Sequence, residues 1–266
     1  MLKLRILTAV VLIPLVLALI FYAPGWLFAL VLALLALAGA WEWAALAGFE
    51  DRLRRALCVL GCSLLMAVVW FFNQQLPYPQ ILMLLCLSAL AWWLLSALWV
   101  AFWHVELSRP LKLVCGLLTL LPSLAAVVAL RVRPLGLLLL LLVVWAADIG
   151  AYFTGRAFGR HKLAPLVSPG KTWEGLVGGL AAAVLVATAG GAWLPVSRAP
   201  FILICVFVCL FSVVGDLSES LFKRQAGVKD SGVLFPGHGG VLDRVDSLTA
   251  AAPIYWLGLY WLGAWS

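Results

Sequence analysis

The sequence predicts an all-α, polytopic membrane protein, because it is rich in apolar residues, poor in charge and arranged in long apolar runs. Of its 266 residues, 65% are hydrophobic and 11% are charged, and the mean hydropathy is +1.12. Soluble domains carry about 25% charged residues, so a water-soluble globular fold is excluded. Lipid provides no hydrogen-bond partners for the backbone, and an apolar run of about 20 residues matches one transmembrane helix.

Nine long, mainly uncharged stretches account for the crossings. They cover residues 6–23, 26–48, 56–73, 80–103, 111–130, 135–154, 173–195, 201–222 and 247–265. The first follows Lys3 and Arg5 as in a signal peptide, but it lacks a small-residue cleavage pattern, so we expect a retained helix. We divide the chain into an N-terminal region of about five spans (1–130) and a C-terminal catalytic region of about four spans (131–266).

Lys and Arg are distributed unevenly between the two sides of the membrane. When successive connections are assigned to alternate sides, one side receives 15 of the 18 Lys and Arg residues, and the other receives Arg131, Arg133 and Arg198. Basic residues are retained on the cytoplasmic side. We therefore expect a multi-pass protein of the inner (cytoplasmic) membrane, with a cytoplasmic N-terminus and an extracytoplasmic C-terminus. The net charge of +7 reflects this topology and indicates no nucleic-acid partner.

Polar residues gather in two of the predicted cytoplasmic connections, 155–172 and 223–246. The first is basic and contains no acid, whereas the second mixes Lys and Arg with Asp230, Asp243 and Asp246. Such a connection can be a solvated surface alone. Acids also occur at the helix ends that lead into these connections, namely Asp148, Asp216 and Glu219.

The spacing of the acids favours a metal site at the cytoplasmic face. Asp216 and Ser220 are four residues apart, and Asp243 and Asp246 are three apart where the ninth helix begins, so each pair shares a helix face. Carboxylates at a membrane are costly without cations. Oxygen ligands of this kind suit Mg²⁺, which one or two carboxylates and substrate phosphates typically hold.

Two further segments have the composition of anion-binding sites. Residues 168–172 (Ser-Pro-Gly-Lys-Thr) end like a phosphate-binding loop, but Pro165 replaces its first glycine and we expect no strand before it, so that interpretation is rejected. A basic segment leading into a helix at Trp173 remains, and helix N-termini favour anions. The glycines around His238 either bring backbone N–H groups close to an anion or form a plain turn.

Two weaker features complete the inventory of the spans. Glu42 is an acid within a span, which is a functional hint, but we favour a side chain that reaches the membrane interface. Gly175 and Gly179 form a small-xxx-small pair that we expect to pack helices. Taken together, the residues indicate metal-assisted phosphoryl or nucleotidyl transfer to a lipid.

Residues 220–246 resemble the complete signature of the phosphatidate cytidylyltransferases, also called CDP-diacylglycerol synthases. The match includes Lys223-Arg224, residues 229–232 (Lys-Asp-Ser-Gly) and residues 235–246 (Phe-Pro-Gly-His-Gly-Gly-Val-Leu-Asp-Arg-Val-Asp). Residues 159–173 and 215–217 are also similar to bacterial members. The resemblance covers about residues 145–252, and the first 130 residues match only as hydrophobic helices.

This resemblance implies transfer of CMP from CTP to phosphatidate, with release of pyrophosphate. It implies a homodimer in the lipid bilayer and a requirement for Mg²⁺, as one ion or with a second. The resemblance implies three groups of site residues. The metal ligands are Asp216, Asp243 and Asp246. The catalytic residues are Asp243, Asp246, Lys171, Lys223 and Arg224, and the residues that bind the phosphates of CTP or phosphatidate are Lys229, His238, Arg244 and Ser220.

Two other classes of function are compatible with parts of this pattern. Another CTP-dependent lipid cytidylyltransferase or a polyprenol kinase would share the metal site and differ in its acceptor. A membrane transporter would place its polar residues near the middle of the membrane, often at broken helices. Here the polar residues collect at one face, which favours an enzyme.

Overall fold

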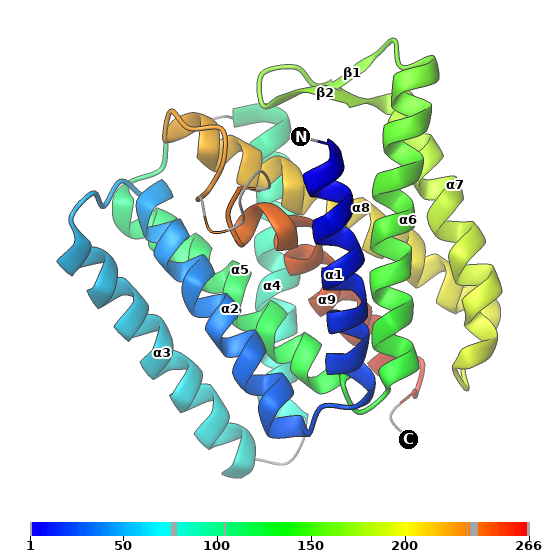
Figure 1. Cartoon of the computed structure of the whole chain (residues 1–266), viewed down its shortest axis with the longest axis horizontal. Coiled ribbons are helices and arrows are strands. Elements are labelled where there is room, and N and C mark those ends of the chain that lie inside the picture. Colours follow the sequence, from blue (N-terminus) through cyan, green and yellow to red (C-terminus); the bar gives the residue numbers. More distant parts are fainter. Residues whose placement is uncertain (1, 76–78, 104, 233, 235–238, 265–266) are drawn as a thin grey trace.

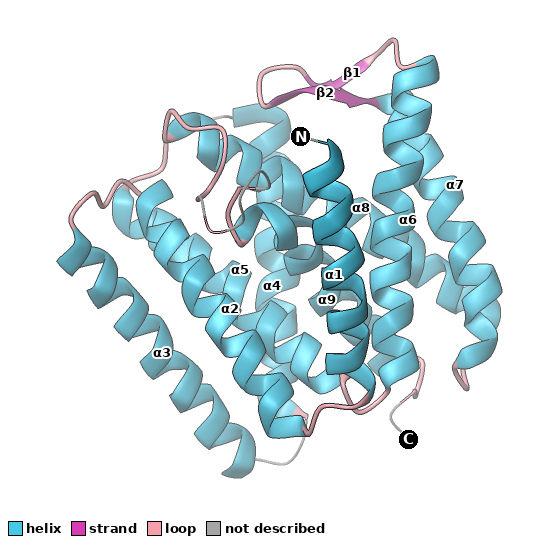
Figure 2. Ribbon diagram, viewed as in Figure 1, coloured by secondary structure: helices cyan, strands magenta, loops and turns pink. Residues whose placement is uncertain are grey.

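The computed structural model describes residues 2–75, 79–103, 105–232, 234 and 239–264, which form a helical bundle with one short hairpin (Figures 1 and 2). The helices in this part of the chain are α1 (Leu2–Phe21), α2 (Gly25–Leu46), α3 (Arg52–Gln75), α4 (Gln80–Leu98), α5 (Arg109–Leu130), α6 (Pro134–Phe158), α7 (Trp173–Gly190), α8 (Arg198–Gln225) and α9 (Leu242–Trp261). A π-helical turn, η1 (Trp99–Trp103), continues α4, and a 3₁₀ turn, η2 (Gly191–Trp193), continues α7.

The predicted fold class is confirmed: the chain is an all-α, polytopic membrane protein. Within the described residues, α2 to α8 are long and apolar enough to cross a membrane. In α1 the apolar part is the shorter segment Val10–Phe21, and α9 begins with charged residues. The count of nine crossings therefore stays a prediction, although each predicted span overlaps one of the helices.

The two ends of the bundle differ in what they carry. The start of α1, the hairpin and the α8–α9 connection lie at one end, which we call the hairpin end (Figure 1). The α1–α2 and α5–α6 connections lie at the opposite end, and α9 ends on that side. Three of the five predicted basic segments thus lie at the hairpin end.

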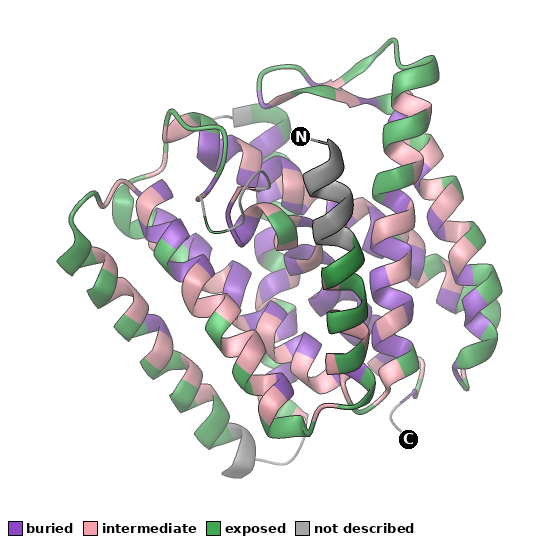
Figure 3. Ribbon diagram, in the orientation of Figure 1, coloured by how far each residue is buried: buried purple, intermediate pink, exposed green. Residues whose placement is uncertain are grey.

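Helix α9 is the central helix of the bundle. It packs against α2, α4, α5, α6 and α8, and its Tyr255 and Trp256 side chains are fully buried. In Figure 3 the buried residues gather in the interior of the bundle, around this helix. By contrast, α3 exposes Leu57, Leu64 and Trp70, as expected of a helix that faces lipid. Because protein surrounds α9, this helix tolerates the polar first turn that a lipid-exposed span could not.

Helices α6 and α7 pack closely through glycines. A Cβ atom at Gly175 would lie 2.9 Å from the carbonyl oxygen of Ala151, and one at Gly179 would lie 2.8 Å from that of Ala147. Any side chain there would force the helices apart. The interpretation of these glycines as helix-packing residues is confirmed.

The connection between α6 and α7 is a β-hairpin, which the sequence analysis did not foresee. Strand β1 (Lys162–Ala164) pairs antiparallel with β2 (Ser168–Thr172). The expectation of a loop without strands was wrong, although a phosphate-binding loop is still excluded because residues 168–172 form a strand. Three- and five-residue strands leave too little periodicity to be detected.

Contacts at both ends of the hairpin hold it in place. Val167, at the turn, is fully buried. At the base, the carboxylate of Glu174 in α7 accepts hydrogen bonds from the backbone N–H of Arg160, at 3.1 Å, and of His161, at 3.2 Å. The hydroxyl of Thr172 caps α7 by accepting from Gly175 N at 3.1 Å. Lys171 is therefore carried by an anchored strand.

Candidate active site

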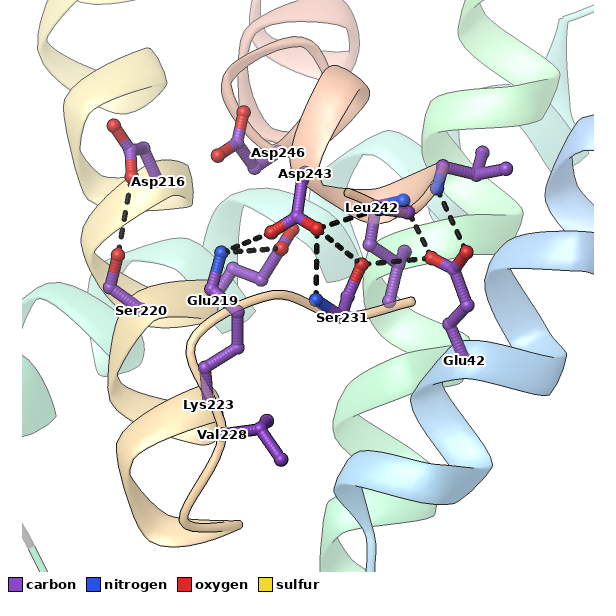
Figure 4. Close-up of polar contacts among 12 residues, drawn as sticks. Glu42, Asp216, Glu219, Ser220, Lys223, Val228, Ser231, Leu242, Asp243 and Asp246 are labelled. Atoms are coloured by element: carbon purple, nitrogen blue, oxygen red, sulfur yellow. Dashed lines mark hydrogen bonds and ion pairs between the residues drawn. The ribbon is translucent and has the colours of Figure 1, made fainter. Parts of the chain in front are cut away.

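The candidate site forms where the last turns of α8 meet the first turn of α9, and strand β2 adds one lysine. Gly215 allows the close contact between the helices, since a Cβ atom there would lie 2.5 Å from the carbonyl oxygen of Asp246. The next residue, Asp216, is thereby brought beside Asp246, and Figure 4 shows the Asp246 carboxylate directed toward the side on which Asp216 lies. The acids predicted from two separate segments thus occupy one site.

Lys223 lies between two acids in this site. Its ammonium group is 3.1 Å from Oε1 of Glu219, one turn earlier on α8, and 2.6 Å from Oδ1 of Asp243 on α9 (Figure 4). All three side chains are about nine-tenths buried or more. A buried charge is costly unless it is paired and hydrogen-bonded, so Lys223 joins the two helices electrostatically. Its predicted contact with a phosphate stays a prediction.

Asp243 uses both of its oxygens for contacts within the protein. Oδ1 accepts from Lys223, and Oδ2 accepts from the backbone N–H of Ser231 and of Gly240, each at 2.8 Å, and from the Ser231 hydroxyl at 3.0 Å. Gly239, beside this carboxylate, has a φ of +82°, a conformation that favours glycine. In this arrangement, Asp243 organises the connection before α9, and metal binding would require it to exchange some of these donors.

Asp216 contacts the lysine of the hairpin. Its Oδ2 lies 2.6 Å from Nζ of Lys171, and its Oδ1 accepts a hydrogen bond of 3.3 Å from the Ser220 hydroxyl. The side chains of Asp216 and Lys171 are 29% and 26% exposed. Because both are partly open to solvent, this pair is accessible to a substrate phosphate or to a metal ion.

Asp246 adds a second carboxylate next to Asp216. One of its oxygens accepts the backbone N–H of Ser247 at 2.7 Å, and it experiences repulsion from Asp216 and Glu219. Asp148 of α6, an exposed residue, interacts electrostatically with both Asp216 and Lys171. The sequence analysis noted Asp148 at a helix end but gave it no role. Negative charge is thus concentrated around Asp216.

The remaining predicted phosphate-binding residues lie around this cluster. Arg224 is exposed and donates to the carbonyl oxygens of Val167 in the hairpin turn, at 3.5 Å, and of Val228, at 3.3 Å. Lys229 and Arg244 are also exposed. His238 lies outside the described residues. The structure therefore brings Lys171, Asp216, Ser220, Lys223, Asp243 and Asp246 together, with Arg224 at the hairpin turn.

Glu42 is the residue of this region that the sequence analysis misjudged. The interpretation of a side chain that reaches the membrane interface is wrong, because Glu42 is only 6% exposed. Its carboxylate accepts hydrogen bonds from the Ser231 hydroxyl and from the backbone N–H of Val241 and Leu242, each at 2.9 Å (Figure 4). The signal was present in the sequence, since an ionisable residue within an apolar span is functional by default.

The carboxylates fit a metal site that substrate would complete. No three His, Cys, Asp or Glu side chains among the described residues are arranged to hold one ion. Asp216 and Asp246, however, supply the hard oxygens that Mg²⁺ takes from a protein when phosphates provide its other ligands. Asp216 and Asp246 repel each other because both carry negative charge, and a bound cation would offset this repulsion.

Comparison with known proteins identifies the family. A profile of the Cytidylyltransferase family matches residues 3–262. The chain belongs to this family. A relative from Pseudomonas aeruginosa named phosphatidate cytidylyltransferase is 45% identical, over 100% of this chain and 99% of the relative. One from Haemophilus influenzae with the same name is 43% identical, over 96% of this chain and 97% of the relative.

Family members also match over shorter segments. A phosphatidate cytidylyltransferase from Brucella suis is 54% identical over 123 residues, which is 43% of this chain and 43% of the relative. The full-length matches carry more weight, because they include both Glu42 and the α8–α9 region in one alignment.

Proposed function

We propose that this protein is a phosphatidate cytidylyltransferase that transfers CMP from CTP to phosphatidate, giving CDP-diacylglycerol and pyrophosphate. The observation that carries the proposal is the full-length similarity to two relatives with this name. The site supports it, because acids and lysines meet at the ends of membrane helices. Charge neutralisation and positioning are the main demands of transfer at phosphorus.

In the proposed reaction, a phosphate oxygen of phosphatidate attacks the α-phosphorus of CTP, and the bond to the pyrophosphate leaving group breaks. Lys171 is proposed to meet the incoming phosphate, and the partial exposure of its side chain and of its present partner, Asp216, supports this role. Arg224, Lys229 and Arg244 are exposed at the same end of the bundle and are proposed to bind phosphates of CTP or phosphatidate. His238 is proposed for the same role from the resemblance alone.

We propose Mg²⁺ as the cofactor, held by Asp216 and Asp246. When bound, the ion neutralises charge on the transferring phosphate. Asp243 stays a proposed third ligand, one that would exchange its contact with Lys223. Ser220, which already donates to Asp216, orients that carboxylate.

We also propose the membrane arrangement and the assembly. The hairpin end faces the cytoplasm of a bacterium, in its inner membrane, because the basic start of α1, hairpin and α8–α9 connection lie there. CTP and the charged head group of phosphatidate then reach the site from the same side. The proposed homodimer rests on the family resemblance, and molar mass in detergent by light scattering would test it.

A labelling assay tests the proposed activity. Protein purified in detergent should transfer label from α-³²P-labelled CTP to phosphatidate in the presence of Mg²⁺, and γ-³²P-labelled CTP should give no labelled lipid. Label from the γ position would instead identify a kinase. An archaeal ether lipid phosphate as acceptor distinguishes a different cytidylyltransferase. Absence of any labelled lipid, with protein shown to be folded, would refute the proposed function.

A further inference from the structure

Helix α9 begins without a cap from its own segment. Its N-cap residue, Val241, has φ −66° and ψ −45° and makes no side-chain capping bond. The first backbone N–H groups of a helix have no partner within that helix. Here the N–H groups of Val241 and Leu242 donate to the two carboxylate oxygens of Glu42, each at 2.9 Å. The cap therefore comes from α2, 199 residues earlier in the chain.

The same carboxylate is connected to the candidate site through one hydroxyl group. Ser231 Oγ lies 2.9 Å from Oε2 of Glu42 and 3.0 Å from Oδ2 of Asp243. Two glycines make room for Glu42: a Cβ atom at Gly232 would lie 2.5 Å from Oε1, and one at Gly240 would overlap Oε2. The glycines of the signature thus accommodate a residue far outside it.

Residues close to Glu42 on α2 fix the position of Glu42 along the axis of α9. The indole N–H of Trp43 donates to the carbonyl oxygen of Lys112 on α5 at 2.7 Å. The Trp43 ring occupies the space where Gly116 would carry a Cβ atom. Gly39, one turn before Glu42, lies against the side chain of Leu242, 3.1 Å from where its own Cβ atom would be. A shift of α2 along α5 or α9 is therefore blocked.

We propose that Glu42 is a positioning residue for CMP transfer, which acts by fixing the first turn of α9 and with it Asp243 and Asp246. Two of the groups that donate to Glu42 are backbone N–H groups at the start of α9, and the third is the Ser231 hydroxyl. Glu42 therefore acts through α9. The positive end of the α9 dipole and the three donors stabilise its buried charge. The kinetic consequence rests on the proposed function, whereas the structural consequence does not.

The experiment compares Glu42→Gln with Glu50→Gln, an exposed acid between α2 and α3. A glutamine places an NH₂ group where Glu42 presents an oxygen, so one of the donors faces another donor. Hydrogen exchange should accelerate at the backbone amides of Val241 and Leu242, by about tenfold or more, and stay unchanged in α6 and α7.

The kinetic arm separates positioning from stability. In E42Q the kcat for CMP transfer should fall by roughly tenfold to a hundredfold, as small misplacements of catalytic groups do. The KM for CTP should change little, and E42D, which keeps the carboxylate, should recover part of the kcat. E50Q should behave as the unaltered protein in both arms.

Each alternative outcome is decisive. A folded E42Q protein with unaltered kcat would overturn the proposal, even if exchange at α9 accelerates, because Glu42 would then be structural only. If E42Q does not accumulate in the membrane, E42D decides, since it keeps the charge but shortens the side chain by one methylene group and draws the carboxylate back from the N–H groups of Val241 and Leu242; a kcat equal to that of the unaltered protein there overturns the proposal. If the unaltered protein transfers no CMP, the proposed function fails, while the exchange result still tests the cap.

Discussion

Asp216 and Asp243 are both aspartates of the site, but their surroundings give them different tasks. Asp243 is enclosed: it accepts hydrogen bonds from Lys223 and from the backbone N–H of Ser231 and Gly240, and it shares the single proton of the Ser231 hydroxyl with Glu42. Asp216 has a lysine and a hydroxyl as partners and is partly exposed. We therefore expect Asp216 and Asp246 to govern metal binding, and Asp243 to govern the structure of the α8–α9 connection as well.

Substitution of Asp246 by Asn should reduce CMP transfer on the order of a thousandfold, because a neutral amide is a weaker ligand for Mg²⁺. Excess Mg²⁺ should restore part of the rate, since concentration offsets weaker affinity. The measurement is initial rate as a function of Mg²⁺ concentration. Asp230→Asn is the matched control, because Asp230 is an exposed residue of the α8–α9 connection, and it should keep most of the activity. Equal rates in the two variants would contradict the metal assignment.

Substitution of Lys171 by Ala should lower turnover strongly and leave the protein folded, because a partly exposed side chain contributes little to stability. The control is Lys162→Ala on strand β1 of the same hairpin, which is exposed and should retain most activity. Turnover with saturating CTP and the thermal midpoint of the purified protein are measured together. If both variants had comparable activity, Lys171 would have no special role in turnover, and the hairpin would be a solvated surface only.

At the scale of elements, the site depends on how closely helices approach one another. Glycines set these distances in the α6–α7 pair and again where α8 meets α9, at Gly215. The hairpin then adds Lys171, whose ammonium group contacts Asp216 on α8. None of these elements carries the site alone, and small changes in their separation should affect the chemistry.

Gly215→Ala should separate α8 from α9, because the added methyl would lie 2.5 Å from a backbone oxygen of α9. Overpacking of this kind costs about 1–3 kcal/mol, so the thermal midpoint should fall and CMP transfer should fall with it. The control is Gly61→Ala in α3, where nothing lies within 4 Å of the new methyl; its midpoint should be unchanged or higher. Unaltered activity of G215A would show that the separation is not critical.

For the whole molecule, the sequence was sufficient to predict the class, the helices and the polar end, because apolar length and charge asymmetry report on these directly. Residues Asp216 and Asp246 were also predicted to meet. The Glu219–Lys223 pair is four residues apart on α8 and could have been read from spacing, whereas the Lys223–Asp243 contact joins two helices and could not. Spacing also did not reveal the role of Glu42, whose partners follow it by 189 to 200 residues.

The topology gives a prediction at this scale. A reporter fused after Ser266 should report an extracytoplasmic location, and one inserted at Gly232 should report a cytoplasmic one, if all nine helices cross. Alkaline phosphatase and green fluorescent protein fusions provide complementary readouts. Cytoplasmic signals at both positions would mean that α9 does not cross the bilayer, whereas an extracytoplasmic signal at Gly232 would mean that an earlier helix such as α1 does not cross.

The central location of α9 has a consequence for biogenesis. Helix α9 follows the other described helices in the chain, yet it occupies the middle of the bundle, in contact with α2, α4, α5, α6 and α8. The contacts of α2, α4, α5, α6 and α8 with α9 can therefore form only after α9 has been synthesised and has entered between them. Until then Glu42 lacks its α9 partners, and a carboxylate without partners is costly within a membrane. A chain that stops before residue 242 should consequently remain open and prone to proteolysis, because its central place is unfilled.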